Sequence, residues 1–427
     1  MNKVLIISPY FVPLNTADSH RIRMSLPYFE KFGWQAEVIK VNDRYTDMPV
    51  DSLLYQTIPE DIKIHSVNAF SKNWTSKVGL GSIALRSLWF YLKYVNMLLK
   101  KEKFDLIYFS TTQFPVCILG AYWKKKFNIP YIIDVQDPWH TDYYQTKPKS
   151  ERPPKYWFSY RLNKWLEPIA MKPTDGLISV SESYISTLKS RYQKLQAVPA
   201  QTIPFGYSEI DLNVAGTINS TSVQLPSQAI NVVYIGAVGH IMKNSLSILF
   251  ENLKRIKTNH PEIYNRLKFN FIGTSYAPKD TGAPTVIPLA NDYEVADCVT
   301  EQTNRIGYFE ALCLLKKVDG LMILGSDDQN YSASKIYPYL KAEKPLIAIY
   351  NSNSQVFKLL QKFNIGTLIS TEAETDAYKK TLGFLNQLLN AEKTGTVSGN
   401  KEFQKYSAEQ LCKAQTTVFN QVLSLHH

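Results

Sequence analysis

The stretch from Tyr331 to Tyr350, YSASKIYPYLKAEKPLIAIY, combines a polar turn, a short helical pattern and an apolar run. Ser332 or Ser334 suits the N-cap of the helix, which leaves the next backbone amides free to bind an anion. Lys335 adds a positive charge at the same place, so the pattern predicts a phosphate-binding turn. Pro338 falls in or just past the first turn, where a missing N–H costs little. The alternative is an ordinary capped helix with a surface lysine.

A second stretch, GAVGH, follows an apolar run and precedes a helical pattern. A glycine-containing turn between strand and helix lets the backbone approach a diphosphate, which predicts contacts from Gly236, Gly239, His240 and Lys243. The full GxGxxG fingerprint is absent, so a tight strand-to-helix turn is the alternative. Arg305 precedes another helix and is a further candidate cation, for which a surface salt bridge is the alternative role.

Polar residues also follow apolar runs in the first half of the chain. The loop NTADSHR offers groups that hydrogen-bond hydroxyls or phosphates: Asn15, Asp18, His20 and Arg21. His20 is a candidate general base because its ordinary pKa lies near neutrality, and a solvated loop histidine is the alternative. Asp137, in DVQDPW, is a candidate to hold a substrate hydroxyl or to act as a base. Its alternative is capping of the following turn, and Asp134 is expected to be structural.

The elements that position these residues alternate between apolar runs and helical patterns. KVLIIS is followed by the helical pattern RIRMSLPYFEKFGW, and DLIYFS, YIIDVQ and DGLISVS continue the series. A polar stretch at 206–228 interrupts the alternation, which restarts with INVVYIGAV. This order predicts an α/β protein with two doubly wound parallel domains, 1–205 and 229–400, joined by a linker and followed by a helical segment at 401–427. Ligands of such domains bind at the carboxyl ends of the strands.

Composition and charge narrow the class of protein. With 44% apolar and 20% charged residues, the 427-residue chain has a globular composition and enough length for two domains. The formal charge of +11 predicts an anionic partner, and no nucleic-acid-binding motif accompanies it. Four scattered cysteines without a CxxC pair predict reduced thiols and no zinc site. The apolar run in MNKVLIISPY is too short for a signal peptide, so we expect a cytosolic chain.

The order of these pieces resembles that of the GT-B glycosyltransferases, most closely those of family 4. The resemblance covers nearly the whole chain, in the pieces ISPYFVPLN, SHRIRMSLPYFEKFGWQAEVI, YIIDVQDPW, TIPFGYSEIDL, VVYIGAV and SASKIYPYLKAEKPLIAI. It implies two Rossmann-like domains facing a central cleft, with acceptor binding in 1–205, nucleotide-sugar binding in 229–400 and a C-terminal helix packing back on the first domain. The implied reaction moves a sugar from a nucleotide-activated donor to a glycan or lipid-linked acceptor, in cell-surface polysaccharide or glycoconjugate synthesis. It needs no metal or other cofactor.

The chain departs from the pattern of this family at several positions. In the usual pattern two glutamates lie eight positions apart, the second of them seven positions before the proline that precedes a buried strand, and counting back from Pro345 puts Pro338 and Asn330 there. Val238 stands where an arginine is usual, which leaves His240 and Lys243 as substitutes. These departures keep two alternatives open: a non-catalytic GT-B relative that binds glycans or a partner protein, and a sugar-nucleotide epimerase.

Two segments combine aromatic and basic residues, ALRSLWFYLKYVNMLLKK and KYWFSYRLNKWL. Helices of this composition can lie on an anionic membrane, with Trp89, Phe90, Trp157 and Trp165 at the interface. The sequence therefore predicts peripheral contact with the inner face of a membrane. The alternative is that these aromatic side chains pack on the sheet.

Overall fold

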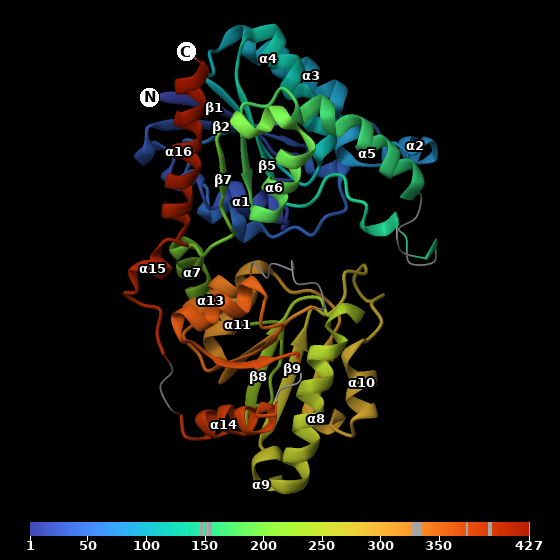
Figure 1. Cartoon of the computed structure of the whole chain (residues 1–427), viewed down its shortest axis with the longest axis vertical. Coiled ribbons are helices and arrows are strands. Elements are labelled where there is room, and N and C mark those ends of the chain that lie inside the picture. Colours follow the sequence, from blue (N-terminus) through green and yellow to red (C-terminus); the bar gives the residue numbers. More distant parts are fainter. Residues whose placement is uncertain are drawn as a thin grey trace. The chain divides into compact units, whose positions relative to one another are not determined.

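The computed structural model describes residues 1–145, 148–149, 152, 156–326, 335–372, 375–391 and 395–426. It divides into two units, one made of Met1–Ser208 with Lys405–His427 and the other of Glu209–Gln404. Each unit has one parallel sheet with helices on both faces (Figure 1). The fold class predicted from the alternating pattern is therefore confirmed.

The first unit contains a seven-stranded sheet in the order β3-β2-β1-β4-β5-β6-β7, and every neighbouring pair is parallel. The central strands are apolar along their length because helices cover both faces. Val4 to Ile7 of β1, for example, are completely buried. The strands are β1 (Asn2–Ile7), β2 (Trp34–Val41), β3 (Lys63–Val67), β4 (Leu106–Ser110), β5 (Tyr131–Val135), β6 (Gly176–Ser179) and β7 (Ala200–Thr202).

The helices of the first unit connect these strands and leave their carboxyl ends at one edge of the sheet. Helix α4 contacts both α3 and α5, so these three helices form one layer. The helices are α1 (Ala17–Arg23), α2 (Lys72–Thr75), α3 (Ile83–Lys101), α4 (Ile118–Phe127), α5 (Tyr156–Met171), α6 (Glu182–Arg191) and the C-terminal α16 (Ala408–His426).

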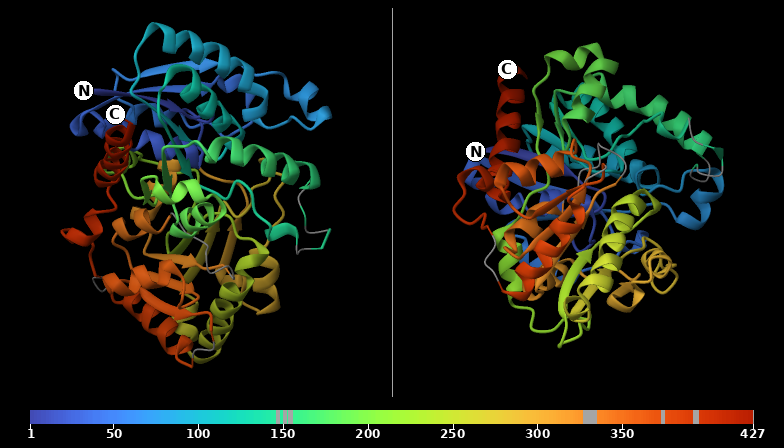
Figure 2. Two further views of the ribbon diagram at one scale, coloured as in Figure 1. Left: turned by 45° about the horizontal axis from the view of Figure 1, so that its top comes forward. Right: turned by 60° about the horizontal axis from the view of Figure 1, so that its bottom comes forward.

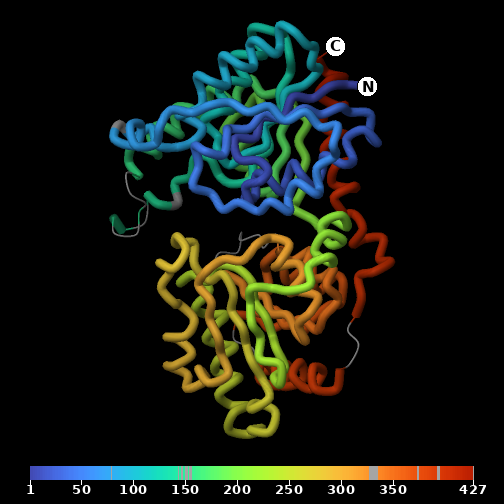
Figure 3. The backbone as a smooth tube through the Cα atoms, turned by 180° about the vertical axis from the view of Figure 1, so that it is seen from behind, coloured from blue at the N-terminus to red at the C-terminus, as the bar shows by residue number. Residues whose placement is uncertain are grey.

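Helix α16 packs on the sheet of the first unit (Figure 2). The ring of Phe419 lies 5.2 Å from that of Trp34 and 5.0 Å from that of Tyr108, measured between centroids. The indole nitrogen of Trp34 donates to Asn420 Oδ1 at 3.0 Å. The two ends of the chain consequently lie on the same side of this unit (Figure 3).

The second unit contains a six-stranded parallel sheet in the order β10-β9-β8-β11-β12-β13. Its strands are β8 (Ile230–Ile235), β9 (Leu267–Ile272), β10 (Val299–Gln302), β11 (Gly320–Leu324), β12 (Leu346–Tyr350) and β13 (Thr367–Ser370). Its helices are α7 (Glu209–Gly216), α8 (Lys243–Asn259), α9 (Pro261–Tyr264), α10 (Val286–Asp292), α11 (Tyr308–Lys317), α12 (Ile336–Lys341), α13 (Gln355–Phe363), α14 (Ala377–Leu389) and α15 (Lys401–Gln404).

Two local expectations from the sequence differ from the structure. The pattern RIRMSLPYFEKFGW is not one helix, because α1 ends at Arg23 and two 3-10 turns follow, the first with Pro27 near its start. Proline removes the amide that a continuous helix needs. The polar stretch 206–228 also contains helix α7, which packs on α11. Its low periodicity concealed a short helix with only three buried residues.

Gly206 allows the chain after β7 to approach the start of α16. The amide of Tyr207 donates to the Tyr406 carbonyl oxygen at 3.0 Å. A Cβ atom added to Gly206 would lie only 1.9 Å from the same carbonyl oxygen. No L side chain fits this position unless the two segments separate.

We therefore expect Gly206→Ala to lower the free energy of unfolding of the first unit by about 1–3 kcal/mol, the usual cost of overpacking. Thermal unfolding and amide hydrogen exchange of α16 measure this loss. Gly216→Ala is the matched control, because a Cβ there meets no atom within 4 Å. Equal stability of the two variants would contradict the prediction.

Candidate functional site

Lys335 lies at the N-cap position of α12, and its ammonium group reaches the end of β8. The Lys335 Nζ atom is 2.7 Å from the Tyr234 hydroxyl and 3.3 Å from the Ile235 carbonyl oxygen. The Tyr234 hydroxyl donates in turn to the Ala237 carbonyl at 3.1 Å. The ammonium group is thus held against the turn that connects β8 to α8.

Gly236 is the residue of this turn that makes room for the ammonium group. Its φ of 136° lies in the region that favours glycine. A Cβ atom at this position would lie 2.8 Å from Lys335 Nζ. The backbone conformation therefore favours glycine at this position, and a Cβ there would displace the Lys335 ammonium group.

The charge of Lys335 has no carboxylate partner among the residues that the structure describes. Burial lowers the pKa of Lys335 to about 7, and no opposing interaction accompanies this shift. A buried ammonium group that has no anionic partner favours the binding of an anion. The anion then replaces the favourable electrostatic interactions that the ammonium group would make with water.

The other residues predicted for this site surround the same turn or the neighbouring strand ends. His240 and Lys243 are exposed, in the 3-10 turn η10 (His240–Met242) and at the start of α8. Gly239 is the extended residue before η10. No side chain of the described residues caps η10 or α8, so their first amides have no such partner. These amides face the side on which a bound anion is favourable.

Arg305 is exposed in the loop after β10. Its guanidinium group lies 5.5 Å from the centre of the Tyr276 ring, so it stacks on an aromatic face. Its Cα atom would be 3.5 Å from a Cβ placed on Gly273, which follows β9. The loop that carries Arg305 therefore lies beside the end of β9, and its side chain stays available to a ligand or to solvent.

The remaining residues named from the sequence belong to the segment around α12 or to the turn after β8. Ser332, Ser334 and Asn330 lie outside the described residues. Pro338 occupies the third position of α12, within the first turn, as predicted. Val238, at the position where an arginine is usual, is buried and carries no charge to this site.

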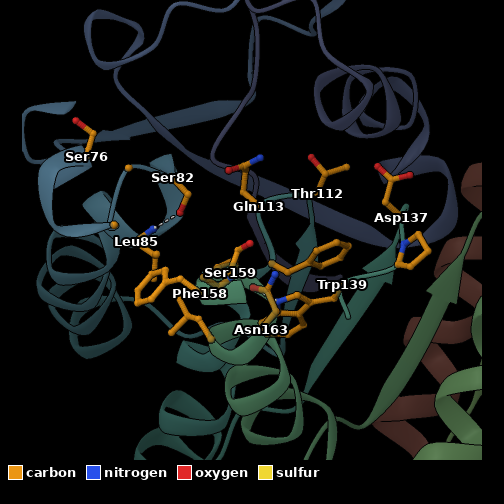
Figure 4. Close-up of a pocket in the computed structure, with 16 residues that line it drawn as sticks. Ser76, Ser82, Leu85, Thr112, Gln113, Asp137, Trp139, Phe158, Ser159 and Asn163 are labelled. Atoms are coloured by element: carbon orange, nitrogen blue, oxygen red, sulfur yellow. Dashed lines mark hydrogen bonds between the residues drawn. The ribbon is translucent and has the colours of Figure 1, made fainter. Parts of the chain in front are cut away.

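A pocket of about 520 Å³ lies in the first unit, at the carboxyl ends of β4 and β5 (Figure 4). Its walls come from the turn η5 (Ser76–Val78) and the residues after it, the first turn of α3, the loops after β4 and β5, and the first half of α5. The lining residues are Ser76, Gly79, Gly81, Ser82, Leu85, Thr112, Gln113, Phe114, Pro115, Asp137, Pro138, Trp139, Phe158, Ser159, Leu162 and Asn163.

The lining combines aromatic surfaces with hydroxyl and amide groups. Phe114 and Trp139 stack with ring centroids 5.5 Å apart, and the Trp139 indole donates to Asn163 Oδ1 at 3.2 Å. None of the sixteen lining residues is cationic, and Asp137 is the acidic one. Such a wall suits the apolar faces and hydroxyl groups of a carbohydrate or a related neutral molecule.

Asp137 is exposed to this pocket, where the sequence placed a candidate for binding or base chemistry. Desolvation by the surrounding walls raises the pKa of Asp137 above its ordinary value, and the nearby charge of Asp18 raises it further. A carboxylate with a raised pKa is a stronger hydrogen-bond acceptor for a hydroxyl group. The geometry thus favours a functional Asp137.

His20 is held by two hydrogen bonds within the first unit, and its role as a general base stays a prediction. Its Nδ1 atom is 3.0 Å from Arg23 Nη2, which can only donate, so Nδ1 is an acceptor. Its Nε2 atom is 2.9 Å from Asn15 Oδ1, so Nε2 carries the proton. Both nitrogens of the neutral ring are engaged, and His20 does not line the pocket. This arrangement disfavours His20 as the general base and occupies Asn15 in the same contact.

Asp18 and Arg21 are also used inside the protein. Asp18 is buried and accepts hydrogen bonds from the hydroxyl groups of Thr111 and Thr112 and from the Thr112 amide, at 2.7–2.9 Å. Burial raises the pKa of Asp18 despite these hydrogen bonds. Arg21 pairs with buried Asp134 at 2.8 Å. Both residues hold segments of the first unit together through these contacts, and their roles in substrate binding stay predictions.

Some residues of these sites were not predicted from the sequence. Tyr234 ends an apolar run and looks like an ordinary core residue, and only the fold brings it to Lys335. Gln113 and Asn163 come from separate elements of the pocket wall. The polar residues TTQ directly after DLIYFS gave a signal for the first of them, whereas Asn163 has no local signal.

The architecture of the two units defines the fold class of the protein. Two parallel α/β units, with the last helix of the chain returning to the first, make the GT-B fold. The family model "Glycosyltransferase Family 4" matches residues 73–208, the segment that holds the pocket. The chain therefore has the GT-B fold, and residues 73–208 match the model of glycosyltransferase family 4, in agreement with the resemblance stated from the sequence.

Solved structures of three relatives share the fold. Sucrose-phosphate synthase from Thermosynechococcus elongatus matches with a TM-score of 0.62 and 13% identity, covering 100% of both chains. HepE of Anabaena, in complex with UDP and glucose, matches with a TM-score of 0.58 and 12% identity, covering 98% of this chain and 100% of HepE. A mutant of S. aureus TarM, in complex with fondaparinux, alpha-GlcNAc-glycerol and UDP, also matches with a TM-score of 0.58 and 12% identity, covering 98% of this chain and 100% of TarM. A search of curated protein sequences finds no match.

Two further findings concern the described part of the chain. No helix in it has both the length and the apolar content needed to cross a bilayer. No group of three or more His, Cys, Asp or Glu side chains in it is arranged to hold a metal ion. The absence of a metal from the reaction stays a prediction.

The lowered pKa of Lys335 predicts a dependence of stability on pH. In the unfolded chain this lysine has its ordinary pKa of 10.5, so between pH 7 and 10 the unfolded state binds more protons than the folded state. Relative to Lys335→Met, the wild-type protein should therefore gain stability as the pH rises from 7 to 10. Urea unfolding at several pH values, with exposed Lys379→Met as the control, measures this difference. A difference that does not change with pH would contradict the lowered pKa.

Proposed function

We propose that the chain transfers a sugar from a nucleotide-sugar donor, bound at the turn after β8, to a hydroxyl group of an acceptor bound in the first-unit pocket. The observation that carries this proposal is the environment of Lys335. Its buried ammonium group lies beside a glycine turn and has no carboxylate partner among the residues that the structure describes. The UDP complexes of HepE and TarM support a nucleoside diphosphate as the group bound there, and they make UDP the first candidate.

The chemistry proposed for the donor site follows from the positive charges around the turn after β8. In the transfer, the bond between the sugar and the diphosphate breaks and a bond to the acceptor oxygen forms. Negative charge then builds on the departing diphosphate, where the cations Lys335 and Lys243 and the amino-terminal end of the α8 dipole stabilise it. The cation of Arg305, in the loop after β10, suits the same role. These groups make a metal unnecessary for the proposed reaction.

Asp137 is proposed to hold the acceptor. The attacking hydroxyl group must lose its proton as the new bond forms, and a carboxylate that accepts a hydrogen bond from it makes the oxygen more nucleophilic. The aromatic and amide lining of the pocket suits a glycan or the sugar part of a lipid-linked acceptor. The TarM complex contains such a small glycoside, which supports this class of acceptor. Synthesis of a cell-surface glycan on the cytoplasmic side of a membrane is the proposed setting.

UDP binding tests the donor site. We expect UDP without added metal to raise the unfolding temperature, because a ligand that binds only the native state stabilises it. Lys335→Ala should weaken UDP binding about 10–150-fold, the equivalent of one hydrogen bond to a charged group. Wild-type affinity should also fall as the pH rises above 7, since the bound state needs the protonated lysine.

The matched control is Lys379→Ala, which removes an exposed lysine from α14 of the same unit. Isothermal titration calorimetry with UDP compares the affinities of the wild type, Lys335→Ala and Lys379→Ala. Unchanged UDP affinity in Lys335→Ala would refute the assigned role. Binding of UDP-sugars without any transfer or hydrolysis would instead favour the non-catalytic alternative, for which the proline at the position of the second glutamate is the supporting observation.

Asp137→Asn tests the acceptor site. The substitution keeps the shape of the side chain and removes its charge, so kcat/KM for the acceptor should fall at least tenfold. A fall in kcat of a hundredfold or more would identify a base, whereas a raised acceptor KM with unchanged kcat would identify a binding group. Ser159→Ala, a change in the same wall, is the control. Unchanged kinetics in Asp137→Asn would remove this residue from the site.

A further inference from the structure

The outer face of the helix layer α3, α4 and α5 in the first unit has an unusual composition. On α3 and α4 the exposed side chains include Trp89, Lys93, Met97 and Lys100, then Tyr122, Lys125 and Lys126; on α5 they include Trp157, Arg161, Lys164, Trp165 and Ile169. We call these twelve side chains the basic-aromatic face. Figure 1 shows the three helices next to one another.

The spacing on α5 shows that this exposure follows the helix geometry. Trp157, Arg161, Trp165 and Ile169 recur every four residues, and Lys164 lies three positions after Arg161, so the five side chains form one stripe along the solvent side. The two tryptophans are 66% and 65% exposed. Burying such surface is favourable, so a stripe of this kind favours contact with an apolar environment.

The distribution of tryptophan supports the same conclusion. The chain has seven tryptophans. Trp34, Trp123 and Trp139 are buried in the first unit, and the other four are at least half exposed. All four exposed tryptophans lie on α2, α3 or α5, where Trp74 of α2 adds a fourth to the three of the basic-aromatic face.

The charged side chains of the basic-aromatic face are all positive. Six lysine and arginine side chains belong to the basic-aromatic face. Helices α3 and α4 contain no acidic residue, and the one acid of α5, Glu167, is buried and paired with Arg191. The guanidinium of Arg161 lies 5.8 Å from the Trp157 ring, and the ammonium of Lys93 lies 5.3 Å from the Trp89 ring. Tryptophan beside lysine and arginine is the composition of helices that lie in the interface of an anionic bilayer.

We infer that the basic-aromatic face docks on an anionic phospholipid surface, with Trp89, Trp157 and Trp165 in the headgroup region. Phe90, which the sequence placed at the same interface, is only partly exposed and packs on Trp89 and Phe70 instead. The cations contribute attraction to the lipid phosphates, and the tryptophans contribute the apolar contact. This combination distinguishes a membrane from a protein partner, which would need complementary acids at specific positions.

The acceptor pocket lies at the end of the same layer. Ser82 and Leu85 at the start of α3 and Phe158 to Asn163 of α5 form part of its wall, and Trp157 directly precedes Phe158. Gly79 lies against Phe158, because a Cβ there would meet the ring at 2.9 Å. Docking would therefore bring the pocket next to lipid headgroups, so that it takes an acceptor sugar carried by a lipid. This last step rests on the proposed function, whereas the docking itself does not.

Vesicle binding of the full chain tests the docking. We expect the protein to float with vesicles of phosphatidylcholine containing phosphatidylglycerol, and to stay unbound with phosphatidylcholine alone or at high salt. The double variant Lys125→Gln/Lys126→Gln should bind at least tenfold more weakly, since each basic residue near the surface adds to the attraction. Trp157→Ser/Trp165→Ser should lose at least as much. Brominated lipids should quench the tryptophan fluorescence of the wild type.

Two controls match these changes. Lys401→Gln/Lys413→Gln removes two exposed lysines elsewhere on the chain, and Tyr276→Ser removes an exposed aromatic residue of the second unit. Both should bind anionic vesicles like the wild type. No binding of the wild type to anionic vesicles, or equal binding by all variants, would overturn the inference. UDP affinity measured on the same proteins reports on the donor site separately, so a failure of docking and a failure of the proposed function are distinguishable.

Discussion

Every strand pair in both sheets is parallel, and this constraint decides where chemistry can occur. A parallel sheet delivers the carboxyl ends of all its strands to one edge, so the connections at that edge bring together residues far apart in sequence. In the second unit this edge brings Lys335 to Tyr234, a separation of 101 residues. In the first unit it brings Thr112, after β4, and Asp137, after β5, to one pocket. A chain of antiparallel hairpins would divide these loops between two edges.

Buried charges hold the loops at the edge of the first unit. Asp134 at the end of β5 pairs with Arg21 of α1, and the Tyr108 hydroxyl of β4 donates to the same carboxylate at 2.9 Å. Arg21 also donates to the Pro204 carbonyl at 3.0 Å, which ties the chain after β7 to this centre. A buried pair of this kind contributes little net stability against an apolar replacement, but removing one partner leaves an uncompensated charge. Its main effect is to hold α1, β4, β5 and the chain after β7 in fixed relative positions.

The alternation of apolar runs and helical patterns was sufficient to predict the fold, because strands buried on both faces leave an unambiguous signal. Proline and low periodicity explain the local errors, as in the segment after α1 and in helix α7. The roles of the site residues could not be decided from the sequence. Asp18, His20 and Arg21 have the chemistry of ligand-binding groups, but residue type does not reveal whether a polar side chain meets a ligand or a buried partner. Only the fold shows that Lys335 lies against a glycine turn and that Asp137 lines a pocket.

The two sites have opposite electrostatic character, and this difference follows the chemistry of the proposed transfer. The turn after β8 offers Lys335, Lys243 and uncapped amides, which stabilise a group that gains negative charge as it leaves. The pocket of the first unit has no cation among its lining residues and one carboxylate with a raised pKa, which suits a neutral hydroxyl group that must become nucleophilic. The carboxylate of the pocket would repel the phosphates of a nucleotide, whereas the ammonium group of Lys335 would attract them. In the proposed transfer, the charges of the two sites would therefore favour the nucleotide at the turn after β8 over the pocket.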